Sequence, residues 1–148
     1  MRIYPQHLPV VADEPRAGDF RVIDVDENRG RGVVVLREFL AGDVLFRMNG
    51  RLTTRMTQHS LQVGPGLHLD DPWFAGMTLH SCDPNSRLDP ETRLYHALKD
   101  IEPGDLLTMD YNHTEDVLFR PFECRCGAEN CRGWVAGRRL VTAAAATA

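Results

Sequence analysis

Short apolar segments broken by glycine and proline dominate the hydrophobic pattern of the chain. Residues 21–25 alternate polar and apolar side chains, which is typical of a strand with one buried face. Residues 33–36 are continuously apolar, as in a buried strand, and residues 28–32 between the two segments carry two glycines. The pattern therefore predicts a β-hairpin with glycines at its tip.

Further strands are predicted along the chain at residues 44–48, 60–63, 94–98 and 106–109. Turn-forming residues separate these segments, at positions 41–43, 64–66 and 102–105. No long stretch repeats its apolar residues with the 3.6-residue period of a helix. Many short strands with frequent glycine and proline predict a mostly β domain.

The composition is that of a single soluble domain. The chain has 148 residues, of which 43% are hydrophobic and 26% charged, and its net charge is −4. Proteins that bind nucleic acids usually present a concentrated basic face, so direct nucleic-acid binding is not expected. No apolar run reaches the roughly 18–20 residues of a membrane span, and the start lacks an apolar signal sequence. We expect a cytoplasmic protein without membrane contact, although a mature chain with its signal removed would look the same.

Four cysteines are the first candidates for a metal site. Cys124, Cys126 and Cys131 lie within eight residues of one another, and Cys82 lies about forty residues upstream. A bridge between Cys124 and Cys126 would be strained, because one residue separates them. Two crossed disulfides or free thiols are the alternatives, but without a secretion signal a reduced site in which four thiolates hold zinc is favoured.

Four separated segments resemble the motifs of one protein family, in the family's order. Residues 29–32 read Arg-Gly-Arg-Gly, and residues 80–85 read His-Ser-Cys-Asp-Pro-Asn. Residues 104–112 read Gly-Asp-Leu-Leu-Thr-Met-Asp-Tyr-Asn, and residues 124–134 combine a Cys-x-Cys-x4-Cys spacing with Arg-Gly-Trp. These segments are similar to those of SET-domain protein-lysine methyltransferases of the compact, bacterial stand-alone type, including the cysteine-rich post-SET segment. The resemblance covers roughly residues 20–140.

The resemblance implies a fold of several small sheets, with a C-terminal pseudoknot and a zinc-clipped post-SET segment. Four parts of the chain are then expected. They are an irregular N-terminal segment at 1–19, a SET domain at 20–117, a post-SET zinc segment at 118–139 and a low-complexity tail at 140–148. In the family the cysteine of the His-Ser-Cys motif completes the zinc site, so Cys82 is expected to join the three C-terminal cysteines. The zinc is expected to be structural, because four thiolates leave no open position for water.

The same resemblance implies the reaction and its residues. The expected cofactor is S-adenosylmethionine, and the expected acceptor is the side-chain amine of a lysine in a protein or peptide. Expected cofactor contacts are Arg29, Gly30, Arg31, Gly32, Leu79, His80 and Trp134. Tyr111 is the expected catalytic residue, because its hydroxyl group can orient the amine. Only about one free lysine side chain in a few thousand is neutral at pH 7, and the motifs contain no dedicated base, so we expect the proton to be lost to water.

Departures from the family pattern border the expected site. Leu79 stands where the family usually has asparagine, Met48 where it has tyrosine, and Gly76 where an arginine is common. Met109 stands where the family has phenylalanine or tyrosine, and because methionine offers no hydroxyl group we predict that more than one methyl is tolerated. Two alternatives therefore stay open: a binding module with the fold but weakened turnover, and a methyltransferase for a small-molecule amine. The sequence names neither the substrate nor the oligomeric state.

Overall fold

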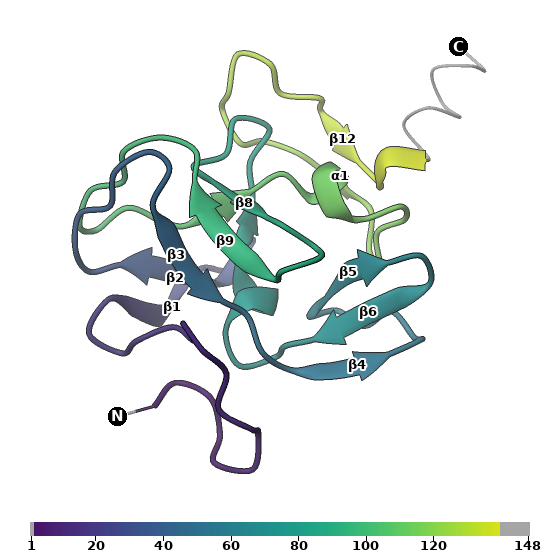
Figure 1. Ribbon diagram of the computed structural model, residues 1–148. Coiled ribbons are helices and arrows are strands. Elements are labelled where there is room, and N and C mark those ends of the chain that lie inside the picture. Colours follow the sequence, from purple (N-terminus) through teal and green to yellow (C-terminus); the bar gives the residue numbers. More distant parts are fainter. Residues whose placement is uncertain (1, 140–148) are drawn as a thin grey trace.

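The structure is a computed structural model that describes residues 2–139; the predicted tail at 140–148 lies outside the described residues. Within the described range the chain forms five small β-sheets of two or three strands each. Figure 1 shows the sheets packed against one another, with short helical turns between them. The prediction of a mostly β fold built from several small sheets is confirmed.

The predicted N-terminal hairpin is present. Strands β1 (Phe20–Asp26) and β2 (Gly30–Val35) pair antiparallel, with a register shift between Asp24 and Asp26. Gly30 opens β2 with a φ of 70°, a left-handed conformation that glycine adopts without strain. The apolar end of β2 is buried, so the hairpin projects its glycine-containing tip from the main body.

Two three-stranded antiparallel sheets form the centre of the molecule. The first has the order β3 (Val44–Arg47), β9 (Leu94–Ala97) and β8 (Ser86–Leu88). The second has the order β4 (Arg51–Thr53), β6 (Leu67–Asp70) and β5 (Ser60–Gly64). The sequence predicted β3, β5 and β9, indicated only unspecified short candidates in the range 49–70 that contains β4 and β6, and did not predict β8.

Two-residue strands join segments that are far apart in the sequence. Strands β7 (Leu79–His80) and β10 (Thr108–Met109) pair in parallel, and β11 (Phe122–Glu123) pairs antiparallel with β12 (Trp134–Val135). Parallel pairing aligns the two central motifs side by side, and one short helix adjoins each of them. These helices are η1 (Ala75–Met77), just before β7, and α1 (Tyr111–Thr114), just after β10.

The main core lies under the hairpin and the β3–β9–β8 sheet. Its centre is a set of contacting aromatic rings, those of Phe20, Phe46, Phe74 and Tyr95, each at most 2% exposed. The N-terminal segment also reaches this core, because Tyr4 is buried and its hydroxyl group donates a 2.6 Å hydrogen bond to a carboxylate oxygen of Asp71. The segment has no strand of its own within residues 2–19, but it is anchored.

The C-terminal segment, residues 118–139, packs beside α1 and the turn that follows it. The backbone N–H of Leu118 donates to the carbonyl of Ala136, and that of Arg138 donates to the carbonyl of Glu115. Whether this contact amounts to the predicted pseudoknot stays a prediction. No helix within residues 2–139 is long and apolar enough to cross a membrane.

Candidate active site and metal site

A cavity of about 470 Å³ lies between the hairpin tip, β5, the β7 segment and α1. Its walls include residues that the sequence singled out, namely Arg29, Gly30, Arg31, Leu79 and Tyr111. These residues come from three segments that are distant in the sequence: the hairpin tip, the β7 segment and α1. The parallel pairing of β7 with β10 brings the β7 segment next to α1. The structure therefore gathers most of the predicted site into one hollow.

Tyr111 is the first residue of α1 and its position is fixed from both ends. Asp110 caps the helix by accepting a hydrogen bond from the backbone N–H of Asn112. The phenol donates a 2.6 Å hydrogen bond to the carbonyl oxygen of Thr78. Burial, and secondarily the charge of Glu115, raise the pKa of Tyr111 above its ordinary value. The phenol is therefore neutral at physiological pH and can orient a substrate group but not act as a base.

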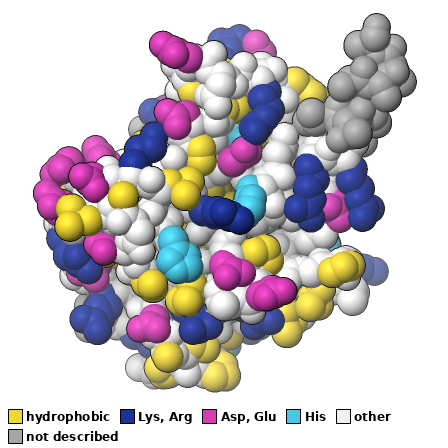
Figure 2. Space-filling view, turned by 45° about the horizontal axis from the view of Figure 1, so that its top comes forward, with side chains coloured by type: hydrophobic (Ala, Val, Ile, Leu, Met, Phe, Trp, Pro, Cys, Tyr) yellow, Lys and Arg dark blue, Asp and Glu magenta, His cyan; other side chains and the backbone are white. Residues whose placement is uncertain are grey.

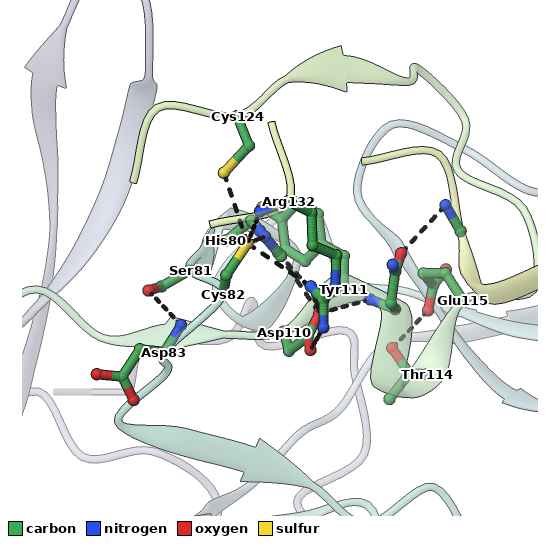
Figure 3. Close-up of polar contacts among 12 residues, drawn as sticks. His80, Ser81, Cys82, Asp83, Asp110, Tyr111, Thr114, Glu115, Cys124 and Arg132 are labelled. Carbon is green, nitrogen blue, oxygen red and sulfur yellow. Dashed lines mark hydrogen bonds and ion pairs between the residues drawn. The ribbon is translucent and has the colours of Figure 1, made fainter. Parts of the chain in front are cut away.

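His80 connects Tyr111 to the cysteines. The backbone N–H of Tyr111 donates to Nδ1 of His80 at 3.0 Å, so the remaining ring proton is on Nε2, which lies 3.3 Å from Sγ of Cys82. Burial lowers the pKa of His80 to about 4, so the ring is neutral and its 3.9 Å approach to Asp110 is not an ion pair. The ring is 2% exposed and lies outside the cavity wall. Figure 3 shows the His80 ring beside both Cys82 and Tyr111.

The four predicted metal ligands meet in one cluster, which we call the cysteine cluster: Cys82, Cys124, Cys126 and Cys131. Their sulfur atoms all lie within 4.8 Å of one another, and none of the four forms a disulfide. Four thiolates about 2.3 Å from one zinc ion lie about 3.8 Å apart in a tetrahedron, and the Cys82–Cys124 sulfur distance is 3.9 Å. The cysteine cluster therefore fits a tetrahedral zinc site.

Arg132 joins the cysteine cluster to the start of α1, a role that the motifs did not predict. Its two terminal nitrogens contact the two carboxylate oxygens of Asp110 at 3.0 and 2.6 Å. One of these nitrogens and the backbone nitrogen lie 3.6 and 3.5 Å from Sγ of Cys82. A bidentate guanidinium contact of this kind fixes both partners in orientation. Cys82 is thus linked to the helix of Tyr111 both through His80 and through Arg132.

Three predicted cofactor contacts lie apart from the cavity wall, namely His80, Gly32 and Trp134. Gly32 packs under it, because a Cβ atom there would lie 3.1 Å from the side chain of Leu79. Trp134, on β12, is 57% exposed and does not line the cavity. The roles assigned to the predicted residues stay predictions.

The departures noted in the sequence have structural counterparts. Gly76 lies against backbone, because a Cβ atom there would be 2.2 Å from the carbonyl oxygen of His59. An arginine at this position would require the backbone to shift. Met109 is buried outside the wall of the cavity, and the hydroxyl group of Tyr95 lies 3.5 Å from its sulfur. This hydroxyl group belongs to a buried residue that does not line the cavity either, so the tolerance of more than one methyl stays a prediction.

Glu115 is a charged cavity residue that the motifs did not indicate. It follows α1 directly, is 4% exposed, and burial raises the pKa of its carboxyl group. Nothing in the sequence distinguishes it from the surface acids, because its burial depends on packing against β5. Its place after the Asp-Tyr-Asn motif, four residues beyond Tyr111, is the only signal that could have found it.

Comparison with known proteins decides the family. The family model of the SET domain matches residues 30–112, more than half of the chain. The chain belongs to the SET-domain family. The matched range begins at the hairpin tip and ends just after Tyr111, so this SET domain contains the walls of the cavity that come from β2, β7 and α1.

Curated relatives share parts of this SET domain. "Methyltransferase flvH" of Aspergillus flavus is 36% identical over 85 residues, which cover 56% of this chain and 48% of that protein. "Histone-lysine N-methyltransferase, H3 lysine-9 specific KMT1" of Fusarium mangiferae is 30% identical over 131 residues, 74% of this chain and 37% of that protein. The chain thus spans less than half the length of these relatives.

Solved structures share the fold. KRYPTONITE, crystallised with mCHG DNA and SAH, matches with a TM-score of 0.65 and 23% identity over 80% of this chain and 29% of that one. The methyltransferase domain of human SETMAR matches with a TM-score of 0.61 and 19% identity over 80% of this chain and 58% of that one. The prediction of the SET fold is confirmed.

Proposed function

We propose that the protein transfers a methyl group from S-adenosylmethionine to the side-chain amine of a lysine in another protein. The observation that carries this proposal is the convergence of the hairpin tip, Leu79 and Tyr111 on one cavity in a chain of the SET-domain family. Relatives named histone-lysine N-methyltransferases support a lysine acceptor, and a solved neighbour that contains SAH supports the cofactor.

The cavity residues suit the proposed cofactor. A volume of about 470 Å³ is within the usual range of small-molecule sites. Arg29 and Arg31 supply positive charge at the hairpin tip, where it can meet a carboxylate, and Leu79 supplies apolar surface. When bound, S-adenosylmethionine supplies an electrophilic methyl group on a sulfonium. We assign the hairpin tip and the Leu79 segment to its binding.

Tyr111 would position the acceptor amine. Its phenol is neutral and already donates its proton to the carbonyl of Thr78, so the phenol oxygen keeps lone pairs for an incoming N–H. A hydrogen bond accepted there would hold the amine nitrogen in one orientation. Orientation of this kind is a large part of the catalysis available to a direct displacement.

The cysteine cluster would hold a structural zinc ion. Four sulfur ligands close the coordination sphere, so the metal would fix the C-terminal segment and leave no position for catalysis. His80 would donate its Nε2–H to the thiolate of Cys82 while accepting from the backbone of Tyr111. The metal would thereby stabilise the orientation of α1.

The test is labelling of a cell lysate with isotopically labelled S-adenosylmethionine. The chain offers a clean background, because Lys99 is its single lysine and can be changed to arginine to remove self-labelling. In this Lys99→Arg background we expect label on lysines of lysate proteins, and a loss on the order of 100-fold in Tyr111→Phe, because orientation through the hydroxyl is removed. Equal labelling by both proteins would refute the assignment of Tyr111. Bound cofactor without any transfer would favour a binding module.

A small-molecule amine is the second candidate acceptor. The observation that favours it is the name of one relative, "Methyltransferase flvH", which specifies no protein substrate. The same experiment separates the two acceptors when the lysate is divided by filtration. Label in the protein fraction supports the lysine acceptor, and label confined to the small-molecule fraction supports the alternative.

A further inference from the structure

Glu115 is the one acidic side chain in the wall of the cavity among the residues that the structure describes. Its carboxyl group is almost fully buried, yet it forms no ion pair with any residue from 2 to 139. Buried carboxylates are normally neutralised by a cation, because an isolated charge is costly away from water. The charge of Arg138, which forms an ion pair with Asp116, also acts on Glu115, but this arginine makes no ion pair with the Glu115 carboxyl group.

The acid and Tyr111 lie on the same face of α1. They are four residues apart, and the backbone N–H of Glu115 donates to the carbonyl of Tyr111 at 2.9 Å, which closes the turn. Both side chains line the cavity, and the charge of Glu115 contributes to the raised pKa of Tyr111. A ligand group that reaches the phenol would therefore also meet the field of this carboxylate.

Hydrogen bonds from β5 hold the acid in place. One carboxylate oxygen of Glu115, Oε2, accepts from the backbone N–H of Gln62 at 2.8 Å and from the hydroxyl group of Thr114 at 2.7 Å. The side chain of Gln62 also accepts from the backbone N–H of Asp116 at 2.8 Å and donates to its carboxylate at 2.9 Å. The other oxygen, Oε1, accepts no hydrogen bond from the described residues, so one oxygen is fixed and one is available to a ligand.

We propose that Glu115 binds the ammonium group of the acceptor beside Tyr111 and accepts its proton before methyl transfer. This inference rests on the proposed function. One N–H bond of the ammonium breaks and one O–H bond forms on Glu115, which leaves an amine with a free lone pair and a neutral carboxylic acid. The acid then loses the proton to water. The expectation from the sequence, that the proton goes directly to water, is replaced by a transfer through a named side chain.

Burial supports this assignment. It raises the pKa of Glu115, so its carboxylate takes up a proton more readily than one in water. A bound ammonium group would place a second positive charge directly beside this carboxylate, which offsets the cost of its burial. A merely structural carboxylate that joins β5 to α1 would need neither the cavity position nor the available second oxygen.

The first test is the pH dependence of methyl transfer by Glu115→Gln. The amide oxygen can still accept from Gln62 and Thr114, so the fold should be kept, and far-UV circular dichroism and thermal unfolding check this. We expect a rate on the order of 100-fold below that of the native protein at pH 7. We also expect the variant's rate to rise about tenfold per pH unit from 7 to 9, because it depends on amine already neutral in solution. A loss that is constant over this pH range would show a structural role only.

The second test needs no turnover, so it separates this inference from the proposed function. The probes are n-butylammonium, which has the shape and charge of a lysine side chain, and neutral 1-butanol, each titrated by NMR into the protein saturated with S-adenosylhomocysteine. We expect the native protein and the exposed control Glu102→Gln to prefer the ammonium roughly tenfold, and Glu115→Gln to lose this preference. An equal preference in all three proteins, or none in the native protein, would overturn the proposal even if methyl transfer occurs. Failure of transfer with a retained preference would overturn only the proposed function.

Discussion

The body of the molecule and its C-terminal segment are held together by different physics. The main core brings together buried side chains from the N-terminal segment to β10, with four aromatic rings at its centre. The second cluster, under the C-terminal segment, buries only Cys82, Leu118, Cys124 and Val135. Apolar burial contributes roughly 25 cal/mol per Å². A cluster of this size therefore cannot offset the conformational entropy lost when about twenty residues become ordered. The body can fold by packing, whereas we expect the C-terminal segment to depend on the proposed zinc ion and on ion pairs.

Loss of the proposed zinc ion should have the largest effect and should act on the C-terminal segment alone. Structural zinc contributes on the order of 10 kcal/mol of apparent binding free energy in small sites. We expect Cys131→Ser to lose zinc by mass spectrometry and to lose hydrogen-exchange protection at Leu118 and Cys124, while the amides of β9 stay protected. Adding zinc to chelator-treated native protein should restore both, and this is the control. Equal loss of protection in β9 would show that the two regions fold as one unit.

Truncation in the main core should act on the whole molecule. Phe46 is 1% exposed and contacts three other aromatic rings, so Phe46→Ala should lower the free energy of unfolding by about 3–5 kcal/mol. Denaturant titration measures the change. The matched control is Phe119→Ala, in which the ring is 46% exposed, and we expect a change within about 0.5 kcal/mol. Similar losses for both variants would contradict the described burial.

Loss of the Arg132 contact should weaken the C-terminal segment alone. Arg132→Ala removes a partly buried bidentate contact with Asp110, and we expect a loss of about 1 kcal/mol. Zinc should pass to a chelator several-fold faster than in the native protein. Arg125→Ala is the control, because its ion pair with Glu123 is largely exposed. The two variants should differ; if they release zinc at the same rate, the link between Cys82 and α1 is unimportant.

Trp134→Ala should have the smallest effect on stability. Its ring is 57% exposed, so we expect the free energy of unfolding to change by no more than about 0.5 kcal/mol. The resemblance predicts in addition that S-adenosylmethionine binds more weakly to this variant, which isothermal calorimetry measures. Unchanged affinity would remove Trp134 from the cofactor site and leave the cavity residues as its walls.

The sequence predicted the parts of the fold that are local. The hairpin of β1 and β2, and the strands β3, β5 and β9, combine a clear apolar pattern with adjacent turns. Strand β4 is three residues long and β6 four, each with mixed polarity, so neither has a readable period. The parallel pairing of β7 with β10 joins residues about thirty positions apart, which no local pattern reveals.

The site residues also divide into those that a local sequence pattern reveals and those that only contacts between distant segments reveal. Tyr111 and the four cysteines were identifiable because they lie in spaced motifs, and the structure places the cysteines together. Arg132 and Glu115 were not identifiable, because a single arginine or glutamate carries no distinctive local pattern. Their roles depend on contacts with other segments. The sequence thus indicated the ligand types, and three-dimensional contacts were needed to find the residues that support them.

The contacts of Gln62 tie the β4–β6–β5 sheet to Glu115 in the wall of the cavity. Because the backbone of β5 binds the carboxylate of Glu115 and its side chain binds the next residue, the hairpin of β5 and β6 cannot move without moving that acid. A substitution in β5 that displaces Gln62 should therefore also displace Glu115 and, with it, the proposed proton acceptor. A compensating change at the end of α1 should then be needed to restore turnover.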